Sequence, residues 1–484
     1  MPHIERLASE GTVLANMHSP SPVCTPSRYA ILTGRYPSRS RSHEFLEGIQ
    51  RDGQAMVGFN THIVPGETTL QQRLRELGYV TGAFGKNHTI EVDAYKRIPY
   101  DSELSDPAVQ SRLTENARVL KTAFLASGFD EADRLYHGNP DADGIKPLAV
   151  HNQDWITEGA LDFIARHKAH PFFLYMATTV PHGPFDKERS WLGDPRITPE
   201  GLLDENDIPK GHPGRDTIEP RLKAAGIGGW NTGAVLWLDD AVGALLDQLT
   251  THRIADNTIV LFVSDHGTEA KGGAYAGGTQ TAAVIWRQGG FPVGETTTAA
   301  LQLTDIAPTL LALGGAKRKR DHIDGMSFAP VLDGTETTVR DALYFEMGYS
   351  RAVIHDGFKY LALRYPARAQ NMPLEKRKRI LDKSNAILSA RGRPLRTTDP
   401  TAPFSHLFLI PGGHDVDQTA IKRHPAFFAE DQLYHLATDP KEQVNLATDP
   451  AYAEKLAEMR QRLARMLSDK AGQFGEFTGT LKQP

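Results

Sequence analysis

The sequence has 484 residues, 40% of them hydrophobic, which is enough for one large or two ordinary domains with a buried core. Its 54 Lys and Arg residues stand against 59 Asp and Glu residues, and the net charge of -5 excludes a global basic field for nucleic acid or an acidic membrane. No apolar run approaches the roughly 20 residues of a membrane-spanning helix. Cys24 is the only cysteine, which excludes an intramolecular disulfide and a CxxC motif.

The first informative segment surrounds that cysteine and reads SPVCTPSRYAILTGR. Pro26 suits the first turn of a helix and Gly34 can end one, which places Cys24 at or just before a helix N-terminus. Backbone N–H groups and the helix dipole favour negative charge there, Arg28 lies one turn along, and such a field increases the acidity of a thiol. A buried structural role is the alternative for a lone cysteine.

From Thr68 to about Leu332, helical and strand periods alternate, which predicts an α/β domain with a mostly parallel central sheet flanked by helices. Thr68 is a candidate N-cap of the first helix, and Gly78 is positioned to end it. The predicted elements that follow are a strand over 79–84, a helix over 155–164, a strand over 171–177, a helix over 234–249 and a strand over 259–263. The apolar runs among them are typical of buried central strands.

Side chains that can do chemistry follow the ends of these strands. Lys86 and His88 come after the first strand, His182 after the second, and Asp265 with His266 after the third. Ligands of open α/β sheets bind at the carboxyl ends of the strands, so we expect these side chains to converge with the cysteine helix. Taken singly, each histidine could be an ordinary surface or supporting group, and Asp265 could be a helix N-cap.

The C-terminal part of the sequence has a different pattern. AVIHDGFKYLAL, with Asp356-Gly357 between two alternating runs, predicts a β-hairpin. We therefore expect an α/β catalytic domain over residues 1–335 and a smaller α+β domain with a small antiparallel sheet over residues 336–484. The smaller domain would hold a basic insertion near 368–400 and a terminal helix that docks back through its apolar face.

The cysteine segment CTPSRYAILTGR resembles, at every fixed position, the signature C/S-x-P-x-R-x-x-x-L-T-G-R of type I sulfatases, which belong to the alkaline-phosphatase-like superfamily. GYVTGAFGKNH resembles the second signature of that family. PFFLYMATTVPHGPF, VSDHG, LTDIAPTLLALGG and LYHLATDPKEQVNLA resemble its later blocks. The resemblance covers most of the chain and implies the alkaline-phosphatase-like α/β fold.

In that family the cysteine is oxidised after translation to a formylglycine, by a maturation enzyme that reads the residues matching Cys24, Pro26 and Arg28. The resemblance implies that Asp265, His266 and residue 24 bind a divalent metal ion, usually calcium, and a carboxylate suits such an ion. It further implies contacts to the sulfate and the formylglycine for Arg28, Lys86 and Lys271, a base in His88 and a proton donor in His182. Taken alone, Lys271 could be an ordinary solvated lysine.

The activity implied by the resemblance is the hydrolysis of sulfate monoesters, and the C-terminal segment suggests a sulfated carbohydrate as substrate. A hydroxyl of the hydrated formylglycine would attack sulfur while cations stabilise the charge on the oxygens. One alternative is a phosphonate or phosphodiester hydrolase of the same superfamily. A second alternative, from a different class, is a non-catalytic protein that binds sulfated ligands.

The N-terminus departs from the family pattern. Family members usually begin with a hydrophobic strand that ends in an Asp-Asp metal pair, whereas this sequence starts after that point, at MPHIERLASEG, and lacks the regions of a signal peptide. Glu5 and Glu10 are poor replacements for the pair. Asp239-Asp240 lies within a helical pattern, and we expect it to cap or solvate that helix. We expect a natural start upstream, with a periplasmic or extracellular location. The alternative is a sulfatase scaffold that has lost much of its metal site.

Overall fold

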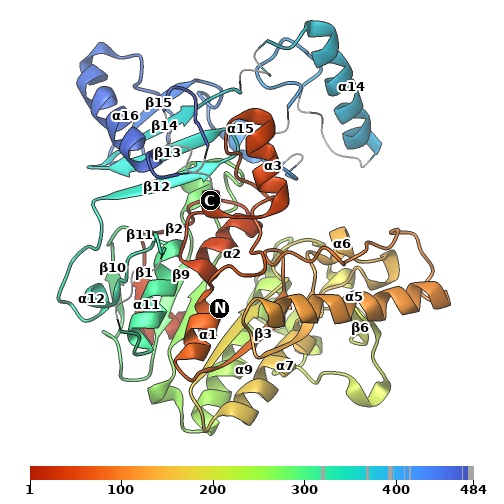
Figure 1. The fold of residues 1–484 in the computed structure, drawn as a ribbon. Coiled ribbons are helices and arrows are strands. Elements are labelled where there is room, and N and C mark those ends of the chain that lie inside the picture. The colour runs from red at the N-terminus through yellow and green to blue at the C-terminus, as the bar shows by residue number, and fades with distance from the viewer. Residues whose placement is uncertain are drawn as a thin grey trace.

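The computed structural model shows two groups of secondary structure, one above the other in Figure 1. The residues that it describes are all of 1–484 except 318–321, 367–368, 370, 391–394, 396, 408, 414–415, 471 and 478–484. The lower group contains most of the chain up to about residue 335, and the upper group contains β12 to β15 with α14 and α16. No helix in the described part of the chain combines the length and the hydropathy needed to cross a bilayer.

A three-stranded parallel sheet forms one half of the lower group. Its strand order is β4 (Glu131–Tyr136), β3 (Val80–Lys86) and β5 (Phe172–Ala177). Long helices precede the outer strands, α5 (Pro107–Ala126) before β4 and α7 (Gln153–His167) before β5, and α7 packs on all three strands. The predicted alternation of helix and parallel strand is thereby confirmed for this part of the chain.

A second sheet in the lower group is mixed. Its order is β10 (Glu295–Thr297), β1 (Thr12–Leu14), β9 (Ala283–Trp286) and β8 (Val260–Val263). β1 and β10 are parallel, but β9 runs antiparallel to both of its neighbours. Between β8 and β9 the described chain forms one short helix, α10 (Ala276–Thr279), and no long crossover helix of the kind that usually joins parallel strands. β5 and β8 are therefore edge strands within the described residues, where the sequence predicted one mostly parallel sheet.

The helix boundaries follow the predicted signals closely. α4 (Leu70–Glu76) begins after Thr69, whose hydroxyl accepts a hydrogen bond from Gln72 N, so the predicted N-cap at Thr68 is wrong by one residue. Gly78 has a φ of +89°, as predicted for the residue that ends this helix. α9 (Thr232–Thr251) precedes β8, again as predicted.

The upper group is built on an antiparallel sheet that includes the predicted hairpin. Asp356 and Gly357, at the tip, both have positive φ, as a two-residue hairpin turn requires. The four strands, in sheet order, are β12 (Ala342–Met347), β13 (Ser350–His355), β14 (Phe358–Leu363) and β15 (Asp431–His435). α16 (Ala453–Leu467) docks on this sheet through Met459, Leu463 and Leu467, as predicted.

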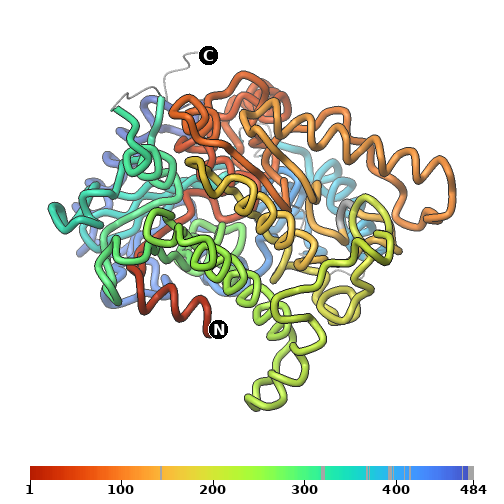
Figure 2. The backbone as a smooth tube through the Cα atoms, turned by 90° about the horizontal axis from the view of Figure 1, so that it is seen from below, coloured from red at the N-terminus to blue at the C-terminus, as the bar shows by residue number. Residues whose placement is uncertain are grey.

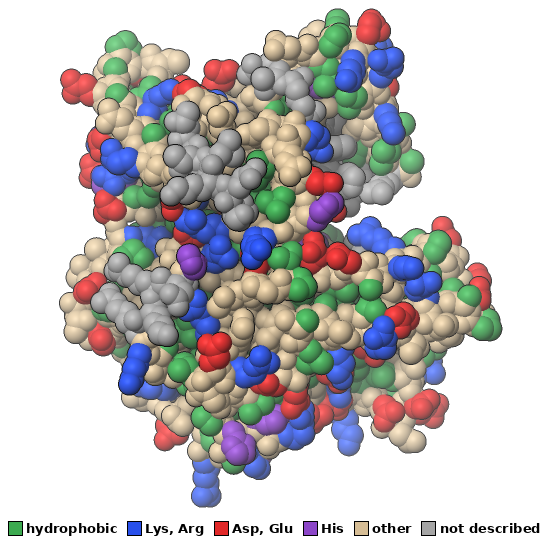
Figure 3. Space-filling model, in the orientation of Figure 1, with side chains coloured by type: hydrophobic (Ala, Val, Ile, Leu, Met, Phe, Trp, Pro, Cys, Tyr) green, Lys and Arg blue, Asp and Glu red, His purple; other side chains and the backbone are tan. Residues whose placement is uncertain are grey.

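The predicted basic insertion contains a helix, α14 (Leu374–Ala390), which buries only Leu381 and Leu388 among its described side chains. Residues 391–394 of the insertion lie outside the described part. Figure 3 shows charged side chains of both signs on the face that it draws, and a hollow between the part that carries α14 and the part below it. A domain division near residue 335 stays a prediction.

The other elements are short or lie near the chain start. They are α1 (Pro2–Glu10), β2 (Met17–His18), α2 (Cys24–Thr33), α3 (His43–Asp52), α6 (Pro140–Asp143), β6 (Ile197–Thr198), β7 (Gly201–Leu202), α8 (Ile218–Ala224), α10 (Ala276–Thr279), β11 (Leu301–Gln302), α11 (Ile306–Leu313), α12 (Ala329–Leu332) and α15 (Gln418–Arg423). Figure 2 shows α1 at the rim of the molecule, and the yellow-green segment before α9 projects from the body.

The first helix is tied to α9 by one carboxylate. α1 has no side-chain cap of its own, and Asp239 Oδ2 and Oδ1 accept hydrogen bonds from the backbone N–H groups of His3 and Ile4. These are the groups that an N-cap normally satisfies. The neighbouring Asp240 pairs with Arg221. Both carboxylates are buried, so the expectation that this pair caps its own helix or is solvated is wrong.

We predict that Asp239→Ala lowers the free energy of unfolding by about 1–2 kcal/mol, because two partly buried N–H groups lose their acceptor. Chemical denaturation followed by circular dichroism measures the change. Asp247→Ala, at an exposed position of the same helix, is the matched control and should change stability by less than about 0.5 kcal/mol. Equal effects of the two substitutions would contradict the conclusion that Asp239 links α9 to the start of α1.

Candidate active site

The site is built around the first turn of α2. Cys24 is its first residue, is only 2% exposed, and follows Val23, which provides no side-chain cap. The Ser27 hydroxyl lies 2.7 Å from the carbonyl oxygens of Ser21 and Val23 and so holds this turn. Gly34, with a φ of +67°, ends the helix. The predicted location of the cysteine at a helix N-terminus is confirmed.

Lys86 enters the site from the end of β3. The ladder between β3 and β4 shifts register between Phe84 and Gly85, and Gly85 has a φ of +92°. A Cβ at this glycine would lie 2.0 Å from Ala177 O, so no larger residue fits there. The bulge directs the next side chain into the site. Lys86 Nζ is thereby placed 3.6 Å from Cys24 Sγ.

Asn139 is a site residue that the sequence analysis missed. It follows β4, and its Oδ1 accepts a hydrogen bond of 2.6 Å from Lys86 Nζ. Its Nδ2 lies 3.5 Å from His182 Nε2, and Lys271 Nζ lies at the same distance from that nitrogen. Asn139 therefore connects the end of β4 with the loop after β5. β4 reads EADRLY and lacks a clear apolar run, so no strand-end signal in the sequence pointed to Asn139.

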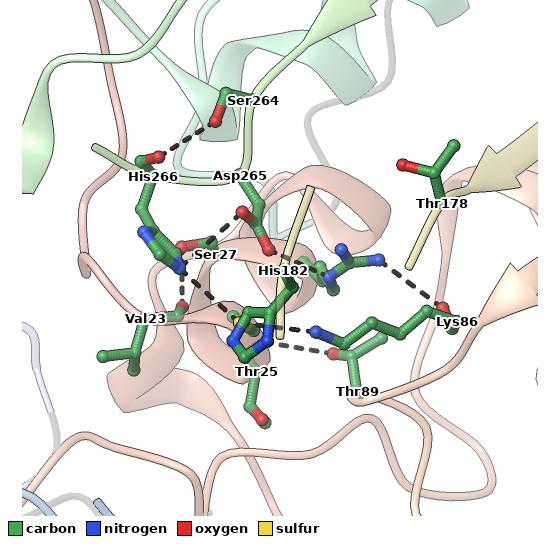
Figure 4. Close-up of polar contacts among 12 residues, drawn as sticks. Val23, Thr25, Ser27, Lys86, Thr89, Thr178, His182, Ser264, Asp265 and His266 are labelled. Carbon is green, nitrogen blue, oxygen red and sulfur yellow. Dashed lines mark hydrogen bonds and ion pairs between the residues drawn. The ribbon is translucent and has the colours of Figure 1, made fainter. Parts of the chain in front are cut away.

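Arg28 and Asp265 form the opposite wall of the site. Arg28 Nε lies 3.1 Å from Asp265 Oδ2, and the guanidinium also donates to Lys86 O and to the hydroxyl of Tyr175 on β5. Figure 4 shows the side chains of Lys86, His182, Asp265 and His266 directed at the start of α2 from different elements. Tyr175 is the second site residue that the sequence analysis did not single out.

His266 directs Nε2 to the same point as Asp265. Its Nδ1 lies 2.8 Å from Gly267 O, which can only accept, so Nδ1 carries a proton and Nε2 faces the site. Nε2 lies 3.5 Å from Cys24 Sγ and 3.7 Å from Asp265 Oδ1. One ligand atom from each of these three residues lies within 4.8 Å of the other two. A carboxylate oxygen, an imidazole nitrogen and a sulfur are all atom types that bind cations.

The three residues are few for calcium, which takes six to eight oxygen ligands. Asp265 is the one carboxylate of this cluster among the described residues, and Arg28 already pairs with one of its oxygens. Asp239-Asp240 is engaged elsewhere, as described above, and Glu10 pairs with Arg6 on α1. Within the described residues, these three ligand atoms are fewer than calcium normally takes.

The electrostatics of the site favour negative charge at residue 24. Burial alone would raise the pKa of the Cys24 thiol, but the charges of Lys86 and Lys271 and hydrogen bonds from His266 and His88 hold it well below its usual value. Burial lowers the pKa of Lys86, although the cysteine opposes this effect. The arrangement therefore stabilises an anion close to the start of α2.

Two histidines complete the site in a neutral form. Burial, followed by the charges of Lys86 and Lys271, lowers the pKa of His182 to about 3. Burial and Lys86 also lower the pKa of His88, which is within hydrogen-bonding reach of Cys24. His88 has a φ of +57°, a conformation that is uncommon for residues other than glycine.

All the residues singled out from the sequence therefore gather at one place, and their individual roles stay predictions. They are Cys24, Arg28, Lys86, His88, His182, Asp265, His266 and Lys271. Three of them are cationic side chains around a single thiol at a helix N-terminus. Chemically, such a pocket binds a compact tetrahedral oxyanion and stabilises charge that develops on its oxygens.

Comparisons with known proteins agree with this chemistry. The family model described as Sulfatase matches residues 1–316. The chain is 27% identical over 367 residues to N-acetylgalactosamine-6-sulfatase of Canis lupus familiaris, a match that covers 71% of this chain and 63%, less than two thirds, of that protein. It is 24% identical over 485 residues to the ulvan-active sulfatase of Formosa agariphila, with 96% of this chain and 70% of that protein covered.

Solved structures show the same fold. One from Bacteroides thetaiotaomicron, described in connection with the metabolism of multiple glycosaminoglycans, superimposes with a TM-score of 0.58 at 19% identity. The match covers 96% of this chain and 93% of that one. The predicted alkaline-phosphatase-like α/β fold is confirmed by this likeness.

We predict that the pocket binds inorganic sulfate and that Lys86→Met weakens this binding about 10- to 100-fold, because a charge-assisted hydrogen bond in a buried site is lost. Isothermal titration calorimetry measures both dissociation constants. Lys121→Met removes an exposed lysine of α5 and should leave the affinity unchanged. An equal sulfate affinity in the wild type and in Lys86→Met would show that the cationic side chains do not bind the anion jointly.

Proposed function

The chain belongs to the sulfatase family, and from this premise we propose that it hydrolyses sulfate monoesters of a sulfated carbohydrate. The observation that carries the proposal is the convergence of Arg28, Lys86 and Lys271 on the buried Cys24. A sulfate ester brings a single negative charge, which this pocket is arranged to receive. The names of the two curated relatives support a carbohydrate as the alcohol part of the substrate.

Members of the family generally use a formylglycine and a divalent metal ion. We propose Cys24 as the precursor of the formylglycine, which supplies, when hydrated, a hydroxyl that attacks sulfur. A maturation enzyme would recognise Cys24 together with Pro26 and Arg28, and it would be a partner of the newly made chain. Placing the nucleophile at the start of α2 puts its developing negative charge beside backbone N–H groups and Lys86.

The cations would bind the sulfate and stabilise its oxygens. Lys86 is held by Asn139 and Arg28 by Asp265, so both side chains are oriented before substrate arrives. Preorganised charges of this kind stabilise a transition state without further reorganisation. Lys271, which is less buried than the other two, would contact the sulfate from the side of His182.

His182 and Lys271 would protonate the departing alcohol. His182 is neutral in the free site, and Lys271 Nζ is a proton donor 3.5 Å from its Nε2. A sulfate bound between Lys86 and Lys271 offsets the charges that lower the pKa of His182 and so favours its protonated form. His88, on the other side of residue 24, is placed to accept a proton when the enzyme is regenerated.

For the metal, we propose that calcium would be held by Asp265, His266 and residue 24. Such an ion supplies a further positive charge for the sulfate oxygens when it is bound. Because these three residues are few for calcium, the roles of the cationic side chains above are derived without it.

We predict that Cys24→Ala lowers sulfatase turnover at least about 100-fold, because the covalent nucleophile can no longer form. Aryl sulfate hydrolysis measures turnover, and mass spectrometry of the peptide around residue 24 detects its conversion in the wild type independently of activity. Cys24→Ser in a host that matures only cysteine should fold normally and be inactive.

The same assay separates the alternatives left open by the sequence. Faster hydrolysis of a phosphodiester than of the aryl sulfate would favour the phosphonate or phosphodiester hydrolase. Sulfate binding without conversion of residue 24 and without turnover would favour the non-catalytic binder.

We predict that His182→Ala spares sulfate binding and lowers kcat about 10²- to 10⁴-fold for an alkyl or sugar sulfate, whose alcohol needs a proton in order to leave. The loss should shrink steadily along a series of aryl sulfates with more acidic phenols. His170→Ala, at an exposed position just before β5, is the matched control. An equal loss for every leaving group would contradict a role of His182 in protonation.

A further inference from the structure

Two large aromatic side chains lie exposed beside His182. Trp230 is 71% exposed and Phe185 is 46% exposed, although aromatic rings of this size are mostly buried. The two rings meet edge to face, with centroids 4.5 Å apart and an interplanar angle of 80°. Phe185 in turn stacks on the His182 ring at 6.3 Å and 22°. We call Phe185 and Trp230 the aromatic ledge.

The segments that carry the ledge are fixed to the site. The loop after β5 is anchored by the buried His151, whose Nδ1 lies 2.8 Å from Thr179 Oγ1 and whose Nε2 lies 3.1 Å from Pro184 O. The segment that carries Trp230 is joined to the same loop, since Asn231 Nδ2 donates a 2.7 Å hydrogen bond to Pro181 O. The backbone next to each ring is therefore tied to the site before a ligand binds, which reduces the entropy cost of binding.

The position of the aromatic ledge relative to His182 places it where the alcohol part of the substrate would bind. Nε2 of His182 faces Lys271 and Asn139, inside the pocket, while Phe185 lies against the ring itself and Trp230 lies beyond Phe185. The oxygen that leaves with the alcohol would lie at His182 under the proposed function. The carbon skeleton attached to that oxygen then extends toward the ledge.

We propose that the ledge binds the pyranose rings of a sulfated carbohydrate, with the first ring near Phe185 and the next ring against Trp230. This inference rests on the proposed function. The apolar face of a pyranose stacks on an aromatic ring while its hydroxyls remain in water, and an amphipathic ring such as Trp suits that use. Two rings are too small an area for a stable protein partner, which needs about 1,200–2,000 Å². Trp230 thus selects substrates longer than one ring.

The test compares substrates of one and two rings. Trp230→Ala should raise KM for a sulfated disaccharide about tenfold with kcat unchanged, and should leave both constants unchanged for an aryl sulfate, which has one ring. Trp230→Phe keeps an aromatic face and should retain most of the affinity for the disaccharide. Val444→Ala, at a site 61% exposed between β15 and α16, is the control for loss of an exposed apolar side chain.

A binding measurement separates this inference from the proposed function. In the Cys24→Ala background, the disaccharide should quench tryptophan fluorescence, and the quenching should be lost in the double variant with Trp230→Phe. If the disaccharide quenches tryptophan fluorescence but the wild type does not turn it over, the proposed function is refuted. The binding role of the aromatic ledge then still holds. An unchanged KM for the disaccharide in Trp230→Ala, or an equal rise for the aryl sulfate, would overturn the ledge.

Discussion

An excess of buried positive charge around one thiol is the constraint on which the rest of the structure depends. Arg28 and Lys86 are buried, Lys271 is half-buried, and the N-terminus of α2 adds its own partial charge. Asp265 is the one carboxylate of this cluster in the described part of the chain. Burying unbalanced charge costs stability, and a bound anion would offset that cost. The same imbalance is the physical basis of the predicted affinity for sulfate.

The fold meets this constraint by holding each cation from a different element. The bulge in β3 aims Lys86, α2 carries Arg28, and the loop after β8 brings Lys271. Mutually repelling side chains cannot gather on one flexible segment, because that segment would move them apart. One helix and two strand ends attached to a packed core leave them no such freedom.

Much of this arrangement could be predicted from the sequence because it depends on local signals. The helix at Cys24 and the side chains after apolar strands follow from Pro, Gly and hydrophobic patterns. Asn139 could not be found in this way, because β4 reads EADRLY, without a clear apolar run. The mixed second sheet was also missed, since its short strands pair across the length of the chain. The aromatic ledge joins residues that only packing brings together.

Because Cys24 is almost completely buried, its proposed oxidation would have to come before the site folds. Under the proposed maturation, an enzyme that oxidises this side chain would have to reach it before Lys86, His266 and Lys271 close around it. Lys271 is the last of these residues to leave the ribosome. The chain between Cys24 and Lys271 takes about 10–50 s to synthesise, at about 5–20 residues per second. The proposed maturation would therefore compete with folding, and a host that folds the chain faster than it modifies residue 24 would accumulate well-folded protein that carries an unmodified thiol.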